Sequence, residues 1–291
     1  MEENLIIDFT PTGMIPVKSL TPHVPISINE IIEDIHLAWE LGITKVHLHA
    51  RDPLTEEASY KKEIYAALIE GIRKFAPTLV ICVSLSGRTF NKFEERSEAL
   101  ELDGFLKPDM GSLTLSSLNF NKIESINSPD MIQNLAEKMQ KLGIVPELEA
   151  FDAGMINYAK YLIKRGLLTP PYYFNLLLGN IACAQADILH AGIMVRDLPE
   201  GSIWSFAGIG DQQLKMNSIA IGIGGGVRVG LEDNIWFDSS RTVLASNTDL
   251  IKRIHVLAGA NDRKIMTSED FRQKMNLRPG NGKYGRNINI N

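Results

Sequence analysis

The sequence predicts a (β/α)8 barrel, a TIM barrel, that occupies residues 1–278 as a single domain and is followed by a C-terminal tail, residues 279–291. Two observations predict this fold. Short apolar runs rich in β-branched residues alternate with segments of helical spacing along the chain. Polar and charged residues also stand at the carboxyl ends of most of these runs, where barrel enzymes collect their active sites.

Each predicted element is a short segment of the chain. The predicted strands are Leu5–Thr10, Lys45–Ala50, Thr78–Leu85, Gly111–Leu115, Val145–Ala150, Tyr173–Leu178, Ile203–Phe206 and Val227–Gly230. The predicted helices are Ile28–Leu41, Lys61–Phe75, Lys92–Leu102, Pro129–Leu142, Met155–Arg165, Ile181–Arg196, Gln212–Ile221 and Arg241–Leu257. A doubly wound open sheet is the main alternative, because its strands and helices alternate in the same way.

Local signals mark the helix boundaries. Ser27 can cap the first predicted helix while Glu30, three residues later, completes a capping box. Gly42, Gly143 and Gly166 follow predicted helices and allow the left-handed turn that ends a helix. The tail is rich in asparagine and glycine, and we expect it to lie on the surface or on a neighbouring subunit.

Composition restricts the class of ligand. The formal net charge is −5, and no clustered basic segment is present, so a nucleic-acid partner is not expected and a small molecule is. The two cysteines, Cys82 and Cys183, are too few for a disulfide scaffold. No run reaches the ~18 apolar residues that a membrane span needs, and the N-terminus lacks the pattern of a signal peptide. We therefore expect a soluble cytoplasmic protein.

His47 and His49 form the first candidate site. They stand two apart on a predicted strand, so both rings point to one face. Their Cα atoms would lie roughly 6.6 Å apart, which two imidazoles can close around one metal ion. The alternative is a pair of core histidines bonded to backbone groups, but burying two polar rings without a shared ion costs several kcal/mol.

A second cluster follows the last predicted strand. Arg228, Gly230 and Glu232 share one face by alternation, and the eighth strand of a barrel adjoins the first. Glu232 is thus placed to be the third ligand of the ion at His47 and His49. The alternative is that Glu232 and Asp233 begin a helix as an acidic pair.

The segments VHLHARDP (46–53) and GGVRVGLEDN (225–234) together resemble the signatures of the β-keto acid cleavage family, best known for activity on 3-keto-5-aminohexanoate. The similarity covers nearly the whole chain. It extends to Pro11-Thr12-Gly13, Val83 to Gly87, Gly111 to Phe120, Pro146 to Gly154, and Leu244 to Asn247.

The resemblance implies a (β/α)8 barrel, usually a homotetramer, with zinc as the usual ion. It also implies an exchange in which a β-keto acid and acetyl-CoA give acetoacetate and a new acyl-CoA. By the same resemblance His47, His49 and Glu232 would hold the metal. Asp233 would be the general base, and Arg228 would position base and substrate. Ser84 would bind the substrate carboxylate, with further polar contacts expected from Glu147, Ser112 and Thr114.

The chain departs from the family pattern in three segments. Met14 and Ile15 stand where the family member with the 5-amino substrate has an acidic residue, so we expect a β-keto acid with a neutral or apolar tail instead. Gly226 replaces a frequent histidine, and Asp211 replaces an arginine. The acidic Asp211 leaves the docking of CoA open, because loops after strands seven and eight commonly bind phosphate.

Two other functions fit the same residues. The chain could be a different metal-dependent lyase, aldolase or hydrolase on the same barrel. It could also be a non-catalytic barrel that binds a metal–ligand complex.

Overall fold

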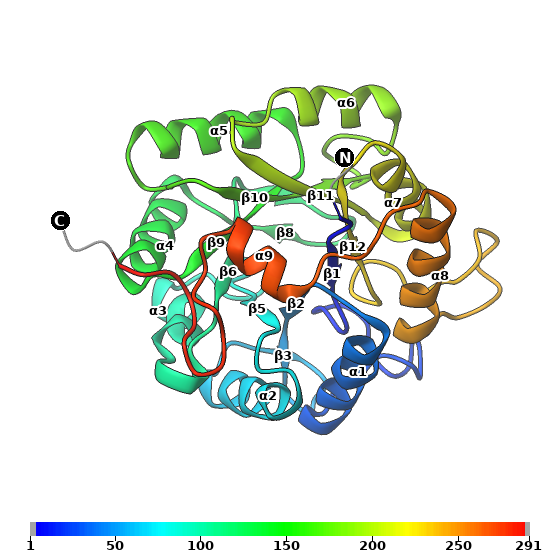
Figure 1. Cartoon of the computed structure of the whole chain (residues 1–291), viewed down its shortest axis with the longest axis horizontal. Helices are drawn as coiled ribbons and strands as arrows, with labels where there is room; N and C mark the ends of the chain where they lie inside the picture. Colours follow the sequence, from blue (N-terminus) through cyan, green and yellow to red (C-terminus); the bar gives the residue numbers. More distant parts are fainter. Residues whose placement is uncertain (1–3, 289–291) are drawn as a thin grey trace.

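The structure is a computed structural model that describes residues 4–288. Within this range eight parallel strands form a closed barrel in the order β1-β12-β11-β10-β9-β6-β5-β2 (Figure 1). Strand β1 (Ile7–Phe9) pairs with β2 (Lys45–Leu48) on one side and with β12 (Gly226–Val229) on the other. This closure confirms the predicted barrel and excludes the open sheet. The other barrel strands are β5 (Val80–Val83), β6 (Met110–Thr114), β9 (Val145–Ala150), β10 (Tyr172–Leu178) and β11 (Ser202–Gly208).

Helices surround the barrel and cover its outer apolar face (Figure 1). They are α1 (Ile28–Leu41), α2 (Lys62–Phe75), α3 (Phe93–Ser97), α4 (Pro129–Leu142), α5 (Ala153–Lys164), α6 (Ile188–Arg196), α7 (Gln213–Gly222) and α8 (Asn247–Ala260), with α9 (Ser268–Lys274) at the end. Ser27 and Glu30 form the predicted capping box, and Gly143 ends α4 in the left-handed conformation. No helix in residues 4–288 is both long and apolar enough to cross a membrane.

Two helix predictions are wrong at their start. Helix α6 begins at Ile188, not Ile181, because Asp187 is its N-cap and accepts a hydrogen bond from the His190 backbone N–H at 2.9 Å. Helix α8 begins at Asn247, not Arg241, because Ser246 is its cap. In both cases apolar residues before the cap extend the helical pattern of the sequence beyond the helix itself. A capping residue inside such a pattern is a stronger boundary signal than the pattern itself.

Two short hairpins were not predicted. Strands β3 (Ala50–Arg51) and β4 (Ala58–Ser59) form one, and β7 (Leu118–Asn119) and β8 (Glu124–Ser125) form the other. Each lies in the loop that follows a barrel strand, so both stand at the carboxyl end of the barrel. These strands have only two residues each, which is too short for a periodic signal.

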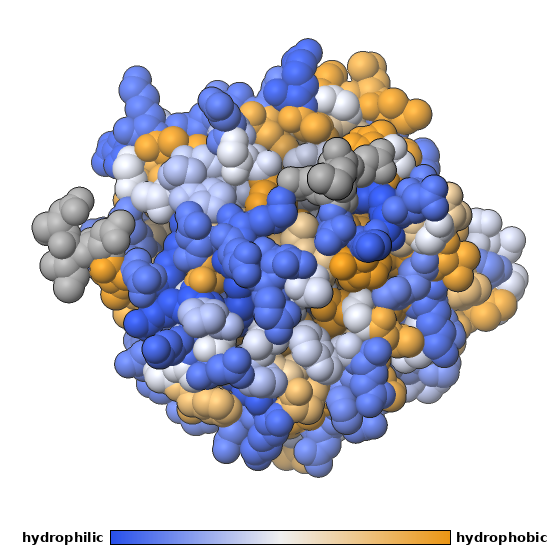
Figure 2. Space-filling model, in the orientation of Figure 1, coloured by the Kyte–Doolittle hydropathy of each residue, from blue (hydrophilic) through white to orange (hydrophobic). Residues whose placement is uncertain are grey.

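Helix α9 covers the opposite, amino-terminal end of the barrel (Figure 1). Its Phe271 packs with Val80, Met110 and Tyr173 in a small apolar cluster inside that end. Ser268 fastens the helix by donating to the Thr44 carbonyl at 2.7 Å. The outer side of α9 is hydrophilic, as the centre of Figure 2 shows. The barrel interior is therefore sealed at this end, and a ligand can enter only at the other.

The predicted tail continues this seal. Gly285 N–H donates to Asp109 Oδ1 at 3.0 Å, and Arg286 N–H donates to the Gly143 carbonyl at 2.6 Å. Tyr284 is buried. The described part of the tail, residues 279–288, thus contacts the barrel of its own chain.

An ion pair joins α9 to the barrel. The Arg272 guanidinium binds both carboxylate oxygens of Asp109, at 2.9 and 2.7 Å, and both side chains are buried. We predict that Arg272→Met lowers the free energy of unfolding by about 3–5 kcal/mol, because it leaves the buried Asp109 carboxylate with only the more distant guanidinium of Arg73, at 3.8 Å. Urea denaturation of the variant measures this loss.

The matched control is Arg196→Met, since the Arg196 side chain is exposed and pairs only with its neighbour Asp197. Arg196→Met should change the free energy of unfolding by no more than about 0.5 kcal/mol. Equal losses in the two variants would contradict the assignment.

Candidate active site at the carboxyl end of the barrel

The three predicted metal ligands meet at the carboxyl end of the barrel. His47 lies in β2, and His49 directly follows it. Their Nε2 atoms are 3.3 Å apart, and Glu232 Oε1 lies 3.2 Å from His49 Nε2. One ligand atom from each residue lies within 4.8 Å of the others. Gly13 makes room for this approach, because a Cβ there would meet the Glu232 Cγ at 2.5 Å.

The three residues fit a divalent cation. Burial lowers the pKa of His49, which favours the neutral ring that can ligate a metal. Burial raises the pKa of Glu232, but the charges of Arg228 and His49 outweigh it, so the pKa lies below its usual range. Glu232 Oε2 is buried and has no hydrogen-bond partner among the described residues. Two imidazoles and an ionised carboxylate with a free oxygen are a typical donor set for zinc and related ions.

Glu147 orients His47 from behind. Its Oε1 lies 2.6 Å from His47 Nδ1, which leaves Nε2 free to face His49. The other Glu147 oxygen accepts from Lys45, whose ammonium also binds Asp8 at 2.6 Å. Glu147 is fully buried and does not line the cavity. Its expected contact with the substrate stays a prediction; its contact with His47 is the one that a carboxylate makes when it orients a histidine for metal binding.

Arg228 connects the metal ligands to the predicted base. Its Nε donates to Asp233 Oδ2 at 3.0 Å, and its Nη2 donates to Glu232 Oε1 at 2.5 Å. Burial raises the pKa of Asp233 to about 6, against the opposing charge of Arg228. A carboxyl group that titrates near neutral pH can both accept and return a proton. Arg228 thus contacts both the predicted ligand Glu232 and the predicted base Asp233.

The buried charges at this end are unbalanced. Five carboxyl groups lie together around two fully buried cations, Lys45 and Arg228; they are Asp8, Glu147, Glu149, Glu232 and Asp233. Burial raises the pKa of Asp8, Glu149 and Asp233, and Arg88 lines the same cavity, so protons and this third cation reduce the excess of negative charge. Buried charges of one sign are costly unless they are paired or bind a metal. A divalent cation at His47, His49 and Glu232 would offset most of this excess.

A cavity of about 400 Å³ opens next to these residues. Of the predicted substrate contacts, Ser84 and Thr114 line it, and so do His49, Glu232 and Asp233. Thr114 Oγ1 also donates to Glu149 Oε2 at 2.7 Å. Ser112 does not line the cavity, because its Oγ is turned back to accept from the Leu85 N–H at 2.9 Å. Its expected role as a substrate contact has no support in this geometry.

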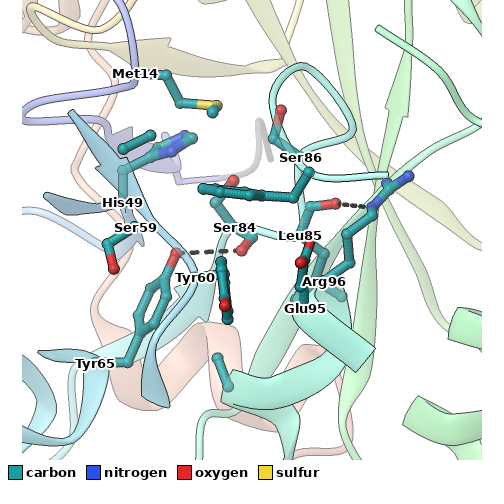
Figure 3. Close-up of a pocket in the computed structure, with 13 residues that line it drawn as sticks. Met14, His49, Ser59, Tyr60, Tyr65, Ser84, Leu85, Ser86, Glu95 and Arg96 are labelled. Carbon is teal, nitrogen blue, oxygen red and sulfur yellow. Dashed lines mark hydrogen bonds between the residues drawn. The ribbon is translucent and has the colours of Figure 1, made fainter. Parts of the chain in front are cut away.

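A smaller pocket lies beside the first (Figure 3). Met14, His49, Ser84 and Ser86 line both spaces, so the two are neighbours. The Tyr65 hydroxyl donates to the Ser84 carbonyl at 3.2 Å and fixes the start of the loop that follows β5 (Figure 3). Met14 therefore presents a thioether, and not a carboxylate, to both spaces.

The sequence analysis missed four residues of the site: Asp8, Lys45, Arg88 and Glu149. Lys45 and Glu149 had a usable signal, because Lys45 and His47 alternate on β2, with His49 continuing the alternation just after it, as Glu147 and Glu149 alternate on β9. Asp8 stands opposite Lys45 in the register of β1 with β2, which only the fold reveals.

A family model described as beta-keto acid cleavage enzyme matches residues 4–277. The chain belongs to this family. It is 34% identical to the 3-keto-5-aminohexanoate cleavage enzyme of Fusobacterium nucleatum, over 96% of this chain and 100% of that protein. It is also 34% identical to the 3-oxoadipate:acetyl-CoA acetyltransferase of Cupriavidus necator, over 95% of this chain and 96% of the relative. The resemblance inferred from the two motif segments is confirmed.

The fold of this β-keto acid cleavage family member is also found in more distant proteins. A solved structure described as the binary complex of ObcA with oxaloacetate superposes with a TM-score of 0.78 at 19% identity, covering 87% of this chain and 67% of that one. At this identity the likeness shows a shared barrel and nothing more.

We predict that Glu147→Gln weakens zinc binding by about 10- to 100-fold, because the amide cannot hold the His47 ring as the carboxylate does. Competition with a chromophoric chelator measures the affinity. Glu137→Gln is the control, since Glu137 is exposed and pairs only with Lys141 on helix α4. An affinity unchanged by Glu147→Gln would remove its positioning role.

Proposed function

We propose that the protein is a metal-dependent acyl-exchange enzyme that converts a β-keto acid and acetyl-CoA into acetoacetate and a new acyl-CoA. The observation that carries the proposal is the position of Asp233, a buried carboxyl group beside the His47, His49 and Glu232 set and in the same cavity. This pairing of a ligand set with an adjacent base suits proton removal next to a ketone.

The residues divide the work between them. His47, His49 and Glu232 would hold a divalent cation, which supplies positive charge to the developing enolate. Arg228 keeps Asp233 turned toward the cavity through its 3.0 Å hydrogen bond. Ser84 lines the cavity near His49 and would receive the carboxylate of the β-keto acid. Thr114 is a second hydroxyl on the same wall.

The exchange needs no water. Asp233 takes a proton from the carbon between the ketone and the carboxylate, and that carbon attacks the carbonyl of acetyl-CoA. The CoA thiolate leaves and then adds to the ketone carbon that came from the β-keto acid. The bond between that ketone carbon and the attacking carbon then breaks, and Asp233 returns its proton to give acetoacetate. The original acyl group departs as its CoA thioester.

The relatives support the choice of co-substrate and reaction. The Cupriavidus necator relative is named as an acetyl-CoA acetyltransferase. Met14 at the cavity argues against an ammonium-bearing substrate such as that of the Fusobacterium nucleatum relative. Asp211 pairs with Arg241 at 3.2 Å, so its charge is partly neutralised where CoA phosphates could dock.

Several finer expectations belong to the same proposal. Zinc is the ion that the donor set suits best. We further propose a homotetramer in the cytoplasm, with residues 1–278 as the catalytic barrel and 279–291 as its tail.

We predict that Asp233→Asn lowers turnover by about 10²- to 10⁴-fold while zinc content stays the same, because the amide cannot accept the proton. A coupled assay of acetoacetate formation, with elemental analysis of the same sample, measures both. Glu232→Gln is the matched control and should lose zinc and turnover together. Full activity of Asp233→Asn would reject the proposed base.

The same assay separates the rival functions. Cleavage of a β-keto acid without CoA would indicate a metal-dependent hydrolase, lyase or aldolase instead. A protein that binds zinc and β-keto acids but turns over none of them would be a binding barrel.

Removal of the metal gives an independent check. We predict that treatment with a chelator abolishes acetoacetate formation and that one equivalent of zinc per chain restores it, since the buried carboxyl groups then regain their counter-ion. Activity that survives complete removal of divalent ions would reject metal dependence.

A further inference from the structure

Arg88 is a cation in the cavity that forms no ion pair with the described part of the chain. It follows β5 and lines the same cavity as His49 and Glu232. Its Nε is buried without a hydrogen-bond partner, and no carboxylate of residues 4–288 lies within ion-pair distance, 4.0 Å. Arg88 itself is half-buried, and the buried part of a guanidinium is costly without a partner, because it loses its hydration. The missing partner is thus expected to be a ligand.

The fold holds this guanidinium in place. It stacks on the Phe120 ring, 3.6 Å from the ring centroid, and Phe120 in turn contacts Phe151 edge-on. The loop before it is tightly packed, since a Cβ at Gly87 would meet the Ile126 carbonyl oxygen at 2.3 Å. An arginine fixed on an aromatic ring keeps its planar fork ready for a carboxylate.

Arg88 lies in the same cavity as the predicted metal ligands but forms no ion pair with Glu232 or Asp233. Burial lowers the pKa of Arg88, and the charges of Glu232 and Asp233 oppose this shift, so the guanidinium lies within their electrostatic reach. No ion pair joins Arg88 to Glu232 or Asp233, so a gap separates the guanidinium from these two carboxylates. The cavity wall is largely apolar, with contributions from Leu118, Phe151, Leu177 and Ile209. A ligand that spans the gap needs apolar carbons in its middle and an anion at its far end.

We propose that the substrate is a β-keto dicarboxylic acid, whose keto-acid end lies at the metal ligands and whose second carboxylate binds Arg88. This inference rests on the proposed function and names its substrate class. It replaces the sequence-based expectation of a neutral or apolar tail, which considered Met14 and Ile15 but not Arg88. Methylene groups between the two carboxylates would pack on the apolar wall.

Two other anions could reach Arg88. One is the carboxylate that every β-keto acid carries, and the other is a phosphate of CoA. Lys122, an exposed lysine of the same cavity, is the alternative contact for a phosphate. The substrates and variants below separate these three sources.

The test compares two β-keto acids of six carbons, 3-oxoadipate and 3-oxohexanoate, which differ in one terminal carboxylate. The native enzyme should favour 3-oxoadipate in kcat/KM by at least about tenfold, and Arg88→Met should reduce this preference by about 10- to 100-fold, mainly through KM. Arg88→Lys should retain part of the preference, because it keeps the charge and loses the fork.

The control is Arg165→Met, which removes an exposed arginine that lies beside the Tyr161 ring on α5, outside the cavity. It should leave the preference unchanged. An Arg88→Met enzyme that loses the same factor on both acids would show that Arg88 binds the shared carboxylate. A rise in the KM of acetyl-CoA alone would show a phosphate contact. Either result overturns the proposal.

A binding measurement keeps this test separate from the proposed reaction. Calorimetric titration of the zinc-loaded protein with adipate and with hexanoate requires no turnover. Adipate should bind more tightly to the native protein, and Arg88→Met should remove the difference. Preserved selectivity for adipate without any acyl exchange would reject the reaction and keep the dicarboxylate site. Acyl exchange with no preference for either acid would keep the proposed reaction and reject the dicarboxylate site.

Discussion

The active site depends on one buried ammonium group. Lys45 lies inside the barrel between the carboxylates of Asp8 and Glu147, and all three side chains are fully buried. Removing such charges from water costs several kcal/mol per ion, which only close pairing and further hydrogen bonds can offset. Asn175 supplies one of these by donating to the second oxygen of Asp8 at 2.8 Å. The cluster is satisfied in one arrangement, and that arrangement orients His47.

The two ends of the barrel do different work. Helix α9 and the tail close the amino-terminal end through Arg272 and Asp109, so the charged cluster is sealed from water there. At the carboxyl end Arg228 donates one hydrogen bond to Glu232 and another to Asp233. Both carboxylates line the cavity, and Glu232 also approaches His49. In the proposed mechanism Asp233 would carry the proton while Glu232 would hold the metal.

Much of the fold could be predicted because its signals are local. Each of the eight predicted barrel strands overlaps an observed one, and α1 and α4 begin and end at the predicted residues. The errors at α6 and α8 arose where apolar residues precede an N-cap and extend the helical pattern falsely. The hairpins β3–β4 and β7–β8 are too short to leave a pattern, and yet the second supplies one wall of the cavity.

The sequence by itself determined which residues could ligate a metal, since His47, His49 and Glu232 are recognisable from residue type and alternation alone. Tertiary structure decided what surrounds them, because burial, pairing and distance arise only when strands far apart in the chain become neighbours. The sequence suggested that Glu147 contacts the substrate. The closed barrel brings β9 across from β2, and there Glu147 contacts His47. Arg88 became significant for the same reason. Its charge is ordinary in the sequence, and only the closed barrel shows that no carboxylate of the described chain lies within ion-pair distance of it.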